Sequence, residues 1–344
     1  MRRLAFVVEG RLTDLTGGQL FNRRIVGGLR DAGREVVILE TAGDVSREIA
    51  ALPPGLPVAI DGTALPAISA AVPELTERCR AVAFVHHPLS QEYGLPLSEL
   101  RAAEALEQRL LPLFRGALCP SQRSAAAVAA LGVPVDRIAV TPPGTDKPNP
   151  LPMRAGGPVR RLLYVANIIP RKGHRVLIEA LAGLADLDWE LCCIGALDRD
   201  AAAAERLRRA IAERDLGTRV YLVGAKPPDE AAGAYAATDA FVSASLHEGY
   251  GMAWAEAMAW GLPQVSTTAG AVAEIVPPDA GLLVPPGDAA AFGDALRRLI
   301  AEPGLAARLA AGARRAAARL PDWPTAIAGW ITAFDHLCGG AGAD

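Results

Sequence analysis

Two glutamates and two glycines lie close together in SASLHEGYGMAWAEAMAWGLP, residues 243–263. Glu248 precedes a loop that contains Gly249 and Gly251, and a predicted helix follows that carries Glu256 about one turn from its start. A glycine loop that enters a helix presents free backbone N–H groups and the positive end of the helix dipole, which suits an anionic ligand such as a diphosphate. A carboxylate one turn into the helix can accept two hydrogen bonds, which suits a ribose diol. Taken alone, the stretch also fits an ordinary strand-to-helix turn with one solvated glutamate.

The seven residues between the two glutamates, in the pattern E-G-Y-G-M-x-x-x-E-A-M-A-x-G-x-P, resemble the retaining glycosyltransferases of the GT-B fold, family 4. Further segments resemble motifs of the same family and follow in the same order. They are the glycine loop Gly17-Gly18, the turn Pro143-Gly144-Thr145-Asp146, the loop Arg171-Lys172-Gly173, Ala269-Gly270 with Glu274, and the run GLLVPPGD at 281–288. Because several motifs occur in the right order and spacing, the resemblance extends through most of the chain.

The resemblance implies a role for each matching residue of the second half of the chain. Glu256 would hold the ribose hydroxyls of a nucleotide sugar, and Glu248 would lie at the donor sugar near the reacting face. Lys172 would neutralise the departing diphosphate. Backbone amides in the glycine loop would contact the sugar and the phosphates, and these belong to Gly249, Tyr250, Gly251 and Met252.

Two residues of the first half also match. Gly18 would bring the first helix of the N-terminal domain onto the same phosphates when the cleft closes. His86, in the segment Phe84-Val85-His86-His87-Pro88, resembles the pocket histidine of the family near the sugar and the anomeric carbon. His87 is the alternative, and we favour His86.

The sequence departs from the family at one point. The strand before the lysine loop usually ends in Gly-Arg, and the arginine joins the lysine on the diphosphate. Here the matching residues are Ala166 and Asn167. Asn167 can donate a hydrogen bond but carries no charge, and Arg171 is the neighbouring cation that could replace the missing arginine.

No pair of residues has the pattern of a nucleophile with its own activating base. We therefore predict front-face substitution, in which the leaving phosphate helps to deprotonate the acceptor and the anomeric configuration is retained. No essential metal and no other cofactor are expected, because a lysine and helix N-termini supply positive charge. The acids Asp198 and Asp200 have the D-x-D spacing of a metal site, and we interpret them instead as the start of a helix.

Apolar runs of strand length alternate with amphipathic segments of helix length, which is typical of parallel sheets covered on both faces. The segment 142–158 interrupts this alternation with six prolines and three glycines and predicts a linker. We expect an α/β protein of GT-B architecture with two doubly wound Rossmann-like domains that face each other across a cleft. The predicted parts are an acceptor-binding domain, 1–155, a nucleotide-sugar-binding domain, 156–320, and a terminal segment, 321–344. The last is a helix that returns to the N-terminal domain, because its aromatic residues Trp323, Trp330 and Phe334 need a surface to cover.

The composition restricts the class of protein. The chain has 344 residues, 51% hydrophobic and 21% charged, and a formal net charge of −3, which argues against a protein that mainly holds nucleic acid. The five cysteines are scattered, and the first apolar run is too short for a signal peptide, so we expect a reduced cytoplasmic protein. The amphipathic segment 101–115 could touch a membrane or a lipid-linked acceptor, but we favour packing on the core.

The sequence thus predicts an enzyme that moves a sugar from a nucleoside-diphosphate sugar, with UDP as the leading nucleotide, to an unidentified small-molecule or lipid-linked acceptor. Two alternatives use the same scaffold: a nucleotide-sugar epimerase or hydrolase, and a non-catalytic nucleotide-sugar binder. A dinucleotide-dependent dehydrogenase is disfavoured, because no G-x-G-x-x-G follows the first strand.

Overall fold

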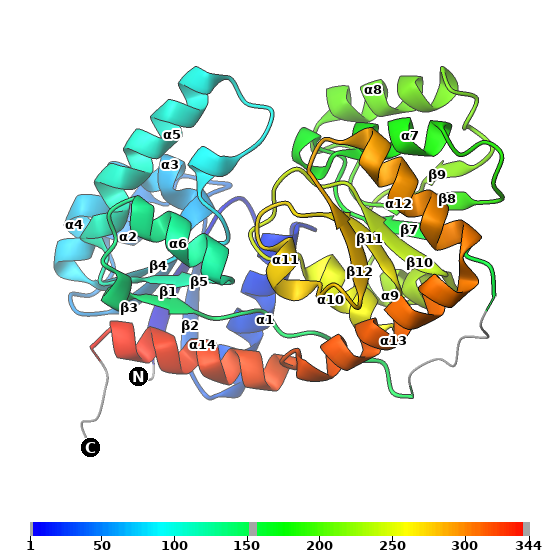
Figure 1. The fold of residues 1–344 in the computed structure, drawn as a ribbon. Helices are drawn as coiled ribbons and strands as arrows, with labels where there is room; N and C mark the ends of the chain where they lie inside the picture. The colour runs from blue at the N-terminus through cyan, green and yellow to red at the C-terminus, as the bar shows by residue number, and fades with distance from the viewer. Residues whose placement is uncertain (1–2, 151–156, 340–344) are drawn as a thin grey trace. The chain divides into compact units, whose positions relative to one another are not determined.

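The protein consists of two compact units in a computed structural model that describes residues 3–150 and 157–339 (Figure 1). The first unit contains Met1–Gly144 and Pro321–Asp344, and the second contains Thr145–Leu320. The boundary therefore falls earlier than the 155 expected from the sequence. Part of the proline-rich segment groups with the second unit, where Lys147 donates a hydrogen bond from Nζ to the carbonyl of Leu320 at 2.6 Å. Residues 151–156 of the predicted linker lie outside the described residues.

The first unit is built on a parallel sheet of six strands in the order β2-β1-β3-β4-β5-β6. The strands are β1 (Arg3–Val8), β2 (Glu35–Glu40), β3 (Pro57–Asp61), β4 (Arg80–Phe84), β5 (Ala117–Cys119) and β6 (Ile138–Val140). The helices are α1 (Gly17–Asp31), α2 (Ser46–Ala50), α3 (Leu65–Ile68), α4 (Val72–Arg78), α5 (Leu97–Leu110), α6 (Gln122–Ala130) and α14 (Trp323–Leu337).

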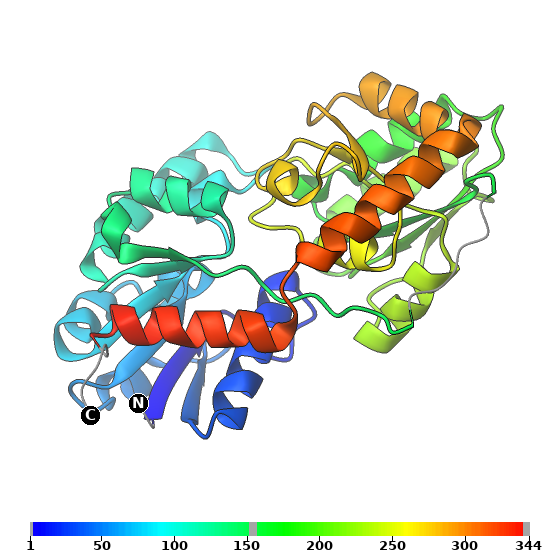
Figure 2. The same cartoon turned by 60° about the horizontal axis from the view of Figure 1, so that its bottom comes forward.

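The terminal helix α14 packs on the first unit and contacts α1 and β5 (Figure 2). Trp330 is fully buried and stacks on Phe6 of β1 at a centroid distance of 6.0 Å and on Phe334 at 5.0 Å. A side chain at Gly28 of α1 would collide with Ile327, so the glycine lets the two helices approach closely. The aromatic face of α14 is buried where the sequence requires a surface for it.

The second unit contains a parallel sheet of six strands in the order β12-β11-β10-β7-β8-β9. The strands are β7 (Arg161–Val165), β8 (Glu190–Ile194), β9 (Val220–Leu222), β10 (Ala240–Ser243), β11 (Gln264–Thr267) and β12 (Gly281–Val284). The helices are α7 (His174–Ala182), α8 (Ala201–Ala212), α9 (Pro228–Ala237), α10 (Met252–Ala259), α11 (Val272–Ile275), α12 (Ala289–Ala301) and α13 (Pro303–Arg319).

Apolar side chains cover both faces of this second sheet. Leu162 and Tyr164 of β7 point into a core shared with α7, α8 and α12, whereas Leu163 between them joins a second core shared with α9, α10 and α13. This period-two alternation between two buried faces is what a doubly wound parallel sheet requires. Counted from β7, the order of the strands is the Rossmann order, 3-2-1-4-5-6.

Most predicted elements agree with the structure, and their ends differ by a few residues. Helix α7 begins at His174, because residues Pro170–Lys172 form a 3₁₀ turn and Gly173 is left-handed. Ser121 caps α6, with its hydroxyl accepting a hydrogen bond from the amide of Ser124 at 3.0 Å. Asp200 caps α8 by accepting the amide of Ala203, which is the role preferred for it over metal binding.

Trp330→Ala should lower the free energy of unfolding by about 3–5 kcal/mol, because it removes the largest side chain between α14 and the sheet. Urea unfolding of the full chain measures this. Thr332→Ala, an exposed change on the same helix, is the matched control and should cost less than about 1 kcal/mol. A small effect of Trp330→Ala would contradict the packing role assigned to α14.

Candidate functional site

The strand order of the second unit reverses between β7 and β10, which are neighbours in the sheet although far apart in sequence. In open α/β sheets, ligands bind outside the carboxyl ends of the strands at such a switch point. The loop after β7 carries Lys172 and the loop after β10 carries Glu248. The topology therefore brings together two of the residues that the sequence singles out.

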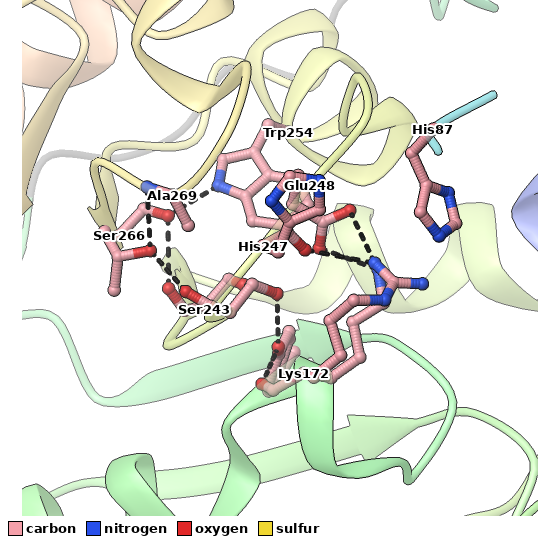
Figure 3. A network of polar contacts seen from close by, with 12 residues as sticks. His87, Lys172, Ser243, His247, Glu248, Trp254, Ser266 and Ala269 are labelled. Atoms are coloured by element: carbon pink, nitrogen blue, oxygen red, sulfur yellow. Dashed lines mark hydrogen bonds and ion pairs between the residues drawn. The ribbon is translucent and has the colours of Figure 1, made fainter. Parts of the chain in front are cut away.

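Lys172 and Glu248 form a close ion pair, with 2.7 Å between Nζ and Oε1 (Figure 3). The Glu248 side chain is only 6% exposed, and a guanidinium nitrogen of Arg171 lies 3.7 Å from its other oxygen. Burial alone would raise the pKa of Glu248, but the charges of Lys172 and Arg171 outweigh it, and the pKa lies below the usual value. Glu248 is therefore ionised at neutral pH and held by two cations.

Two glycines let the loops approach closely enough for this pair. Gly173 has φ +63°, and a Cβ there would lie 1.9 Å from the carbonyl oxygen of Ala244. Gly270 has φ +56°, and a Cβ there would lie 2.0 Å from the carbonyl oxygen of Glu248. Any larger residue at either position would push apart the chain segments that carry Lys172 and Glu248.

Helix α10 begins at Met252, as the sequence predicts, and Gly251 at its N-cap has φ +107°. A Cβ on Gly251 would lie 2.8 Å from the ring of Trp254, whose indole N–H donates to Ser266 at 2.7 Å (Figure 3). No side chain caps this N-terminus within the described residues. Its amides and positive dipole end thus face the loop that carries Glu248, as an anion site requires.

Tyr250 lies between the two loop glycines and is mostly covered. Burial, together with the charge of Glu274, raises the pKa of Tyr250 to about 12, so its hydroxyl keeps its proton at neutral pH. Its neighbour Gly249 continues the loop toward the start of α10.

Glu256 lies one turn into α10 and is half-buried. Its Oε2 accepts a hydrogen bond of 2.8 Å from the hydroxyl of Tyr235 on α9. The position of Glu256 agrees with the sequence prediction, whereas the contact with Tyr235 has no counterpart in the motif.

Asn167 and Arg171 are the two residues considered for the missing family arginine. The Oδ1 of Asn167 accepts the amide of Ala196 at 2.9 Å, which ties the loop after β7 to the loop after β8. Arg171 donates to the carbonyl oxygen of His247 at 3.0 Å, beside Glu248. The second cation at this site is therefore Arg171, on the same loop as Lys172.

In the first unit, the structure brings Gly18 and His86 together. A Cβ on Gly18 would lie 3.3 Å from the His86 ring, so even alanine would crowd the imidazole. His86 donates from Nε2 to Oδ1 of Asn22 at 3.1 Å, and Nδ2 of Asn22 donates to Asp61 at 2.6 Å. Since Asn22 presents its oxygen, Nε2 of His86 must carry a proton, and a neutral His86 has its lone pair on Nδ1.

Asp61 anchors this first-unit network at the end of β3. It is 1% exposed and accepts two further hydrogen bonds from the amide and hydroxyl of Thr63, at 2.9 and 2.7 Å. Burial raises the pKa of Asp61, but the charge of His86 and these hydrogen bonds outweigh it, so the pKa lies below the usual value. Asp61 is therefore ionised beneath His86.

Sequence analysis missed Asn22, Asp61 and Tyr235. A signal was present for the first two: Asn22 interrupts the apolar face of α1, and Asp61 ends a strand that is otherwise apolar. A polar residue at a buried position needs a partner, which is a reason to look for one. Tyr235 gave no such signal, because a tyrosine on a helix fits a core equally well.

Residues 3–150 and 157–339 hold no cluster of three or more His, Cys, Asp or Glu side chains placed to bind a metal. They also form no helix with the length and apolar composition needed to cross a membrane.

Comparison with known proteins connects the second unit to one family. Residues 159–302 match the family described as Glycosyl transferases group 1. The D-inositol 3-phosphate glycosyltransferase of Xylanimonas cellulosilytica is 33% identical over 222 residues, which is 59% of this chain and 52% of that protein. The MMP alpha-(1->4)-mannosyltransferase of Mycolicibacterium hassiacum is 27% identical over 270 residues, 74% of this chain and 64% of that protein. In these matches the chain spans about half to two thirds of its relatives.

Solved structures show the fold. The sucrose-phosphate synthase from Thermosynechococcus elongatus superposes with a TM-score of 0.83 at 20% identity, over 99% of this chain and 100% of that one. Anabaena HepE, solved in complex with UDP and glucose, gives 0.77 at 20% identity, over 98% and 100%. The architecture is GT-B, as the sequence predicts.

Lys172→Met should lower the free energy of unfolding at pH 7 by about 3 kcal/mol, because a buried carboxylate loses its nearest cation. Urea unfolding measures this loss. The matched control is Lys226→Met, which breaks an exposed pair with Glu230 of similar length, 2.8 Å, and should cost less than about 1 kcal/mol. Equal losses in the two variants would contradict a special role for the buried pair.

The same pair predicts a pH dependence. Since the pKa of Glu248 is lowered in the folded state, its contribution to stability is complete above the pKa of the unfolded chain and is lost as pH falls through the folded value. The wild type should therefore lose stability relative to Glu248→Gln as pH falls below about 4.3. A difference in urea midpoint that does not change between pH 7 and pH 3 would show that the carboxylate is not held as an anion.

Proposed function

Because residues 159–302 match the group 1 glycosyl transferases, we propose that the chain transfers a sugar from a nucleoside-diphosphate sugar to an acceptor hydroxyl. A UDP-sugar is the leading donor, supported by the UDP and glucose in the complex of HepE. The reaction retains the anomeric configuration and proceeds by front-face substitution. The acceptor is a small molecule or a lipid-linked compound.

One observation carries the proposal: two cations pair with a buried carboxylate at the switch point of the second sheet, and the loop of that carboxylate leads into a helix N-terminus. Lys172 and Arg171 supply positive charge beside Glu248, and the amides from Gly249 onward lead into α10. Glu256 follows one turn later. A diphosphate suits the cations and the helix N-terminus, and a ribose diol suits the carboxylate of Glu256.

The proposed reaction follows from these charges. The bond between the anomeric carbon and the diphosphate oxygen breaks, and its electron pair leaves with the diphosphate. Lys172, Arg171 and the N-terminus of α10 stabilise the charge that develops there, so the proposal needs no metal. The acceptor oxygen bonds to the same face, its proton passes to the departing phosphate oxygen, and Glu248 lies near the positive charge of the sugar.

Lys172 has two partners in this scheme. It neutralises Glu248 when no donor is present, and its ammonium has three donors, so it can hold Glu248 and a phosphate oxygen at once. For the first unit, we propose that Gly18 contacts the phosphates and that His86 contacts the sugar. The closeness of Gly18 to the His86 ring supports the proposal that the two residues belong to one binding site.

Two other functions use the same groups, namely a nucleotide-sugar epimerase or hydrolase and a non-catalytic binder. Asn167 in place of an arginine is the feature that favours the binder. Incubation with UDP-, GDP- and ADP-sugars, with and without an acceptor mixture, distinguishes them. Acceptor-dependent release of nucleoside diphosphate supports a transferase, acceptor-independent release a hydrolase, a new sugar isomer an epimerase, and binding without turnover a binder.

Glu256→Ala should weaken binding of the nucleoside diphosphate by about 2–3 kcal/mol, as expected for lost hydrogen bonds to a charged group. Calorimetry measures the affinity. Glu230→Ala, an exposed glutamate on α9, is the matched control and should leave it unchanged. Equal affinity in the wild type and Glu256→Ala would refute the ribose assignment.

Activity should survive EDTA, and NMR of the product formed from an α-linked donor should show an α linkage. Lys172→Ala should lower kcat more than affinity, because its contact strengthens as the diphosphate leaves. A β-linked product, or a sugar bound covalently to Glu248, would overturn the front-face mechanism.

A further inference from the structure

Tyr235 has a rigid setting in the core of the second unit. It is 2% exposed, its ring centroid lies 6.3 Å from that of Phe241, and Phe241 in turn packs edge-on against Trp254 of α10 at 5.7 Å. Close packing restricts the rotation of such a tyrosine, so its hydroxyl is held in one place. That place is beside the first turn of α10.

The hydroxyl of Tyr235 lies near the carboxylate of Glu256 and the carbonyl oxygen of Ala253. The carboxylate of Glu256 accepts at 2.8 Å, and the carbonyl oxygen of Ala253 lies at 3.4 Å, so the shorter and charge-assisted bond to Glu256 is the stronger. Burial and the charge of Glu256 raise the pKa of Tyr235 well above its usual value, which keeps the proton on the tyrosine. Tyr235 is thus a donor to Glu256 at neutral pH.

This contact limits the orientation of Glu256. An exposed glutamate on a helix samples several rotamers, and each hydrogen bond to a mobile group costs conformational entropy. A carboxylate accepts about four hydrogen bonds, and Tyr235 takes one of them on Oε2. The tyrosine therefore restricts the orientation of the carboxylate.

We propose that Tyr235 is a positioning residue that orients the carboxylate of Glu256 toward the ribose and so gives the site its selectivity for nucleotides with a 2′,3′-diol. This inference rests on the proposed function, because Glu256 is the ribose ligand in it. Tyr235 itself touches no part of the nucleotide.

The test compares UDP with 2′-deoxy-UDP, using calorimetry on the full chain. In the wild type, UDP should bind more tightly than the deoxy analogue. Tyr235→Phe keeps the ring and removes the donor, and it should weaken UDP about tenfold while affecting 2′-deoxy-UDP much less, so the ratio of the two affinities falls toward one. A purely structural tyrosine would weaken both ligands equally.

Tyr221→Phe is the matched control. Tyr221 belongs to the same unit, is 45% exposed, and donates from its hydroxyl to the carbonyl oxygen of Thr218 at 2.9 Å. Its loss should leave both affinities unchanged. The double variant Tyr235→Phe/Glu256→Ala should bind UDP no more weakly than Glu256→Ala alone, since the two residues act as one unit.

Failure of the inference and failure of the proposed function give different results. If the wild type binds none of UDP, GDP and ADP, the proposed function is wrong. If the wild type prefers UDP over 2′-deoxy-UDP, and Glu256→Ala loses this preference while Tyr235→Phe keeps it, only the role of Tyr235 is wrong.

A second measurement does not depend on the folding of Tyr235→Phe. With 3-fluorotyrosine placed at position 235 of the otherwise unchanged chain, the hydroxyl is retained, and the fluorine resonance reports on the bond to Glu256. UDP should shift this resonance, and 2′,3′-dideoxy-UDP should shift it much less. Equal responses to the two nucleotides would overturn the proposal.

Discussion

The buried ion pair between Lys172 and Glu248 is the contact on which the site of the second unit depends. Each partner comes from a loop after a different strand, and the strands β7 and β10 are neighbours only because the strand order reverses between them. A carboxylate that is 6% exposed is unfavourable unless it is paired. The pair thus selects loop conformations in which Lys172 and Glu248 meet, and these are the conformations that present positive charge at the switch point.

Two glycines in the loops of the second unit permit this ion pair. Gly173 and Gly270 both adopt positive φ. At each position, a carbonyl oxygen of another loop lies so close that a Cβ would collide with it. Glycine is needed at these two positions because a side chain would collide with the neighbouring backbone, and not because the loops must be flexible. The short motifs around Lys172 and Glu248 therefore contain glycine for a reason of packing, and the cation and the carboxylate depend on it.

These particular residues show what could be inferred from the sequence. The start of α10 at Met252 and the burial of α14 were predictable, since a glycine loop and a row of aromatic residues act locally. The partner of Glu256 was not, because Tyr235 lies on another helix and reaches it only through the tertiary fold. The same holds for Asn22, whose partners Asp61 and His86 lie at or just after the ends of two other strands.

Each unit places a buried carboxylate beside a basic side chain at the corresponding topological position. In the second unit, cations gather around the buried Glu248 between β7 and β10. In the first unit, the strand order reverses between β1 and β3, and the ionised Asp61 ends β3 while Gly18 opens the helix after β1. Both switch points hold a buried carboxylate under a basic side chain, Lys172 in one case and His86 in the other.

A lysine offers a fixed charge that suits a phosphate, whereas a histidine next to Asp61 and Asn22 offers a set direction for its proton. The first suits the stabilisation of a leaving group, and the second suits the recognition of a neutral hydroxyl, so the difference between the units follows from the chemistry of the two basic residues.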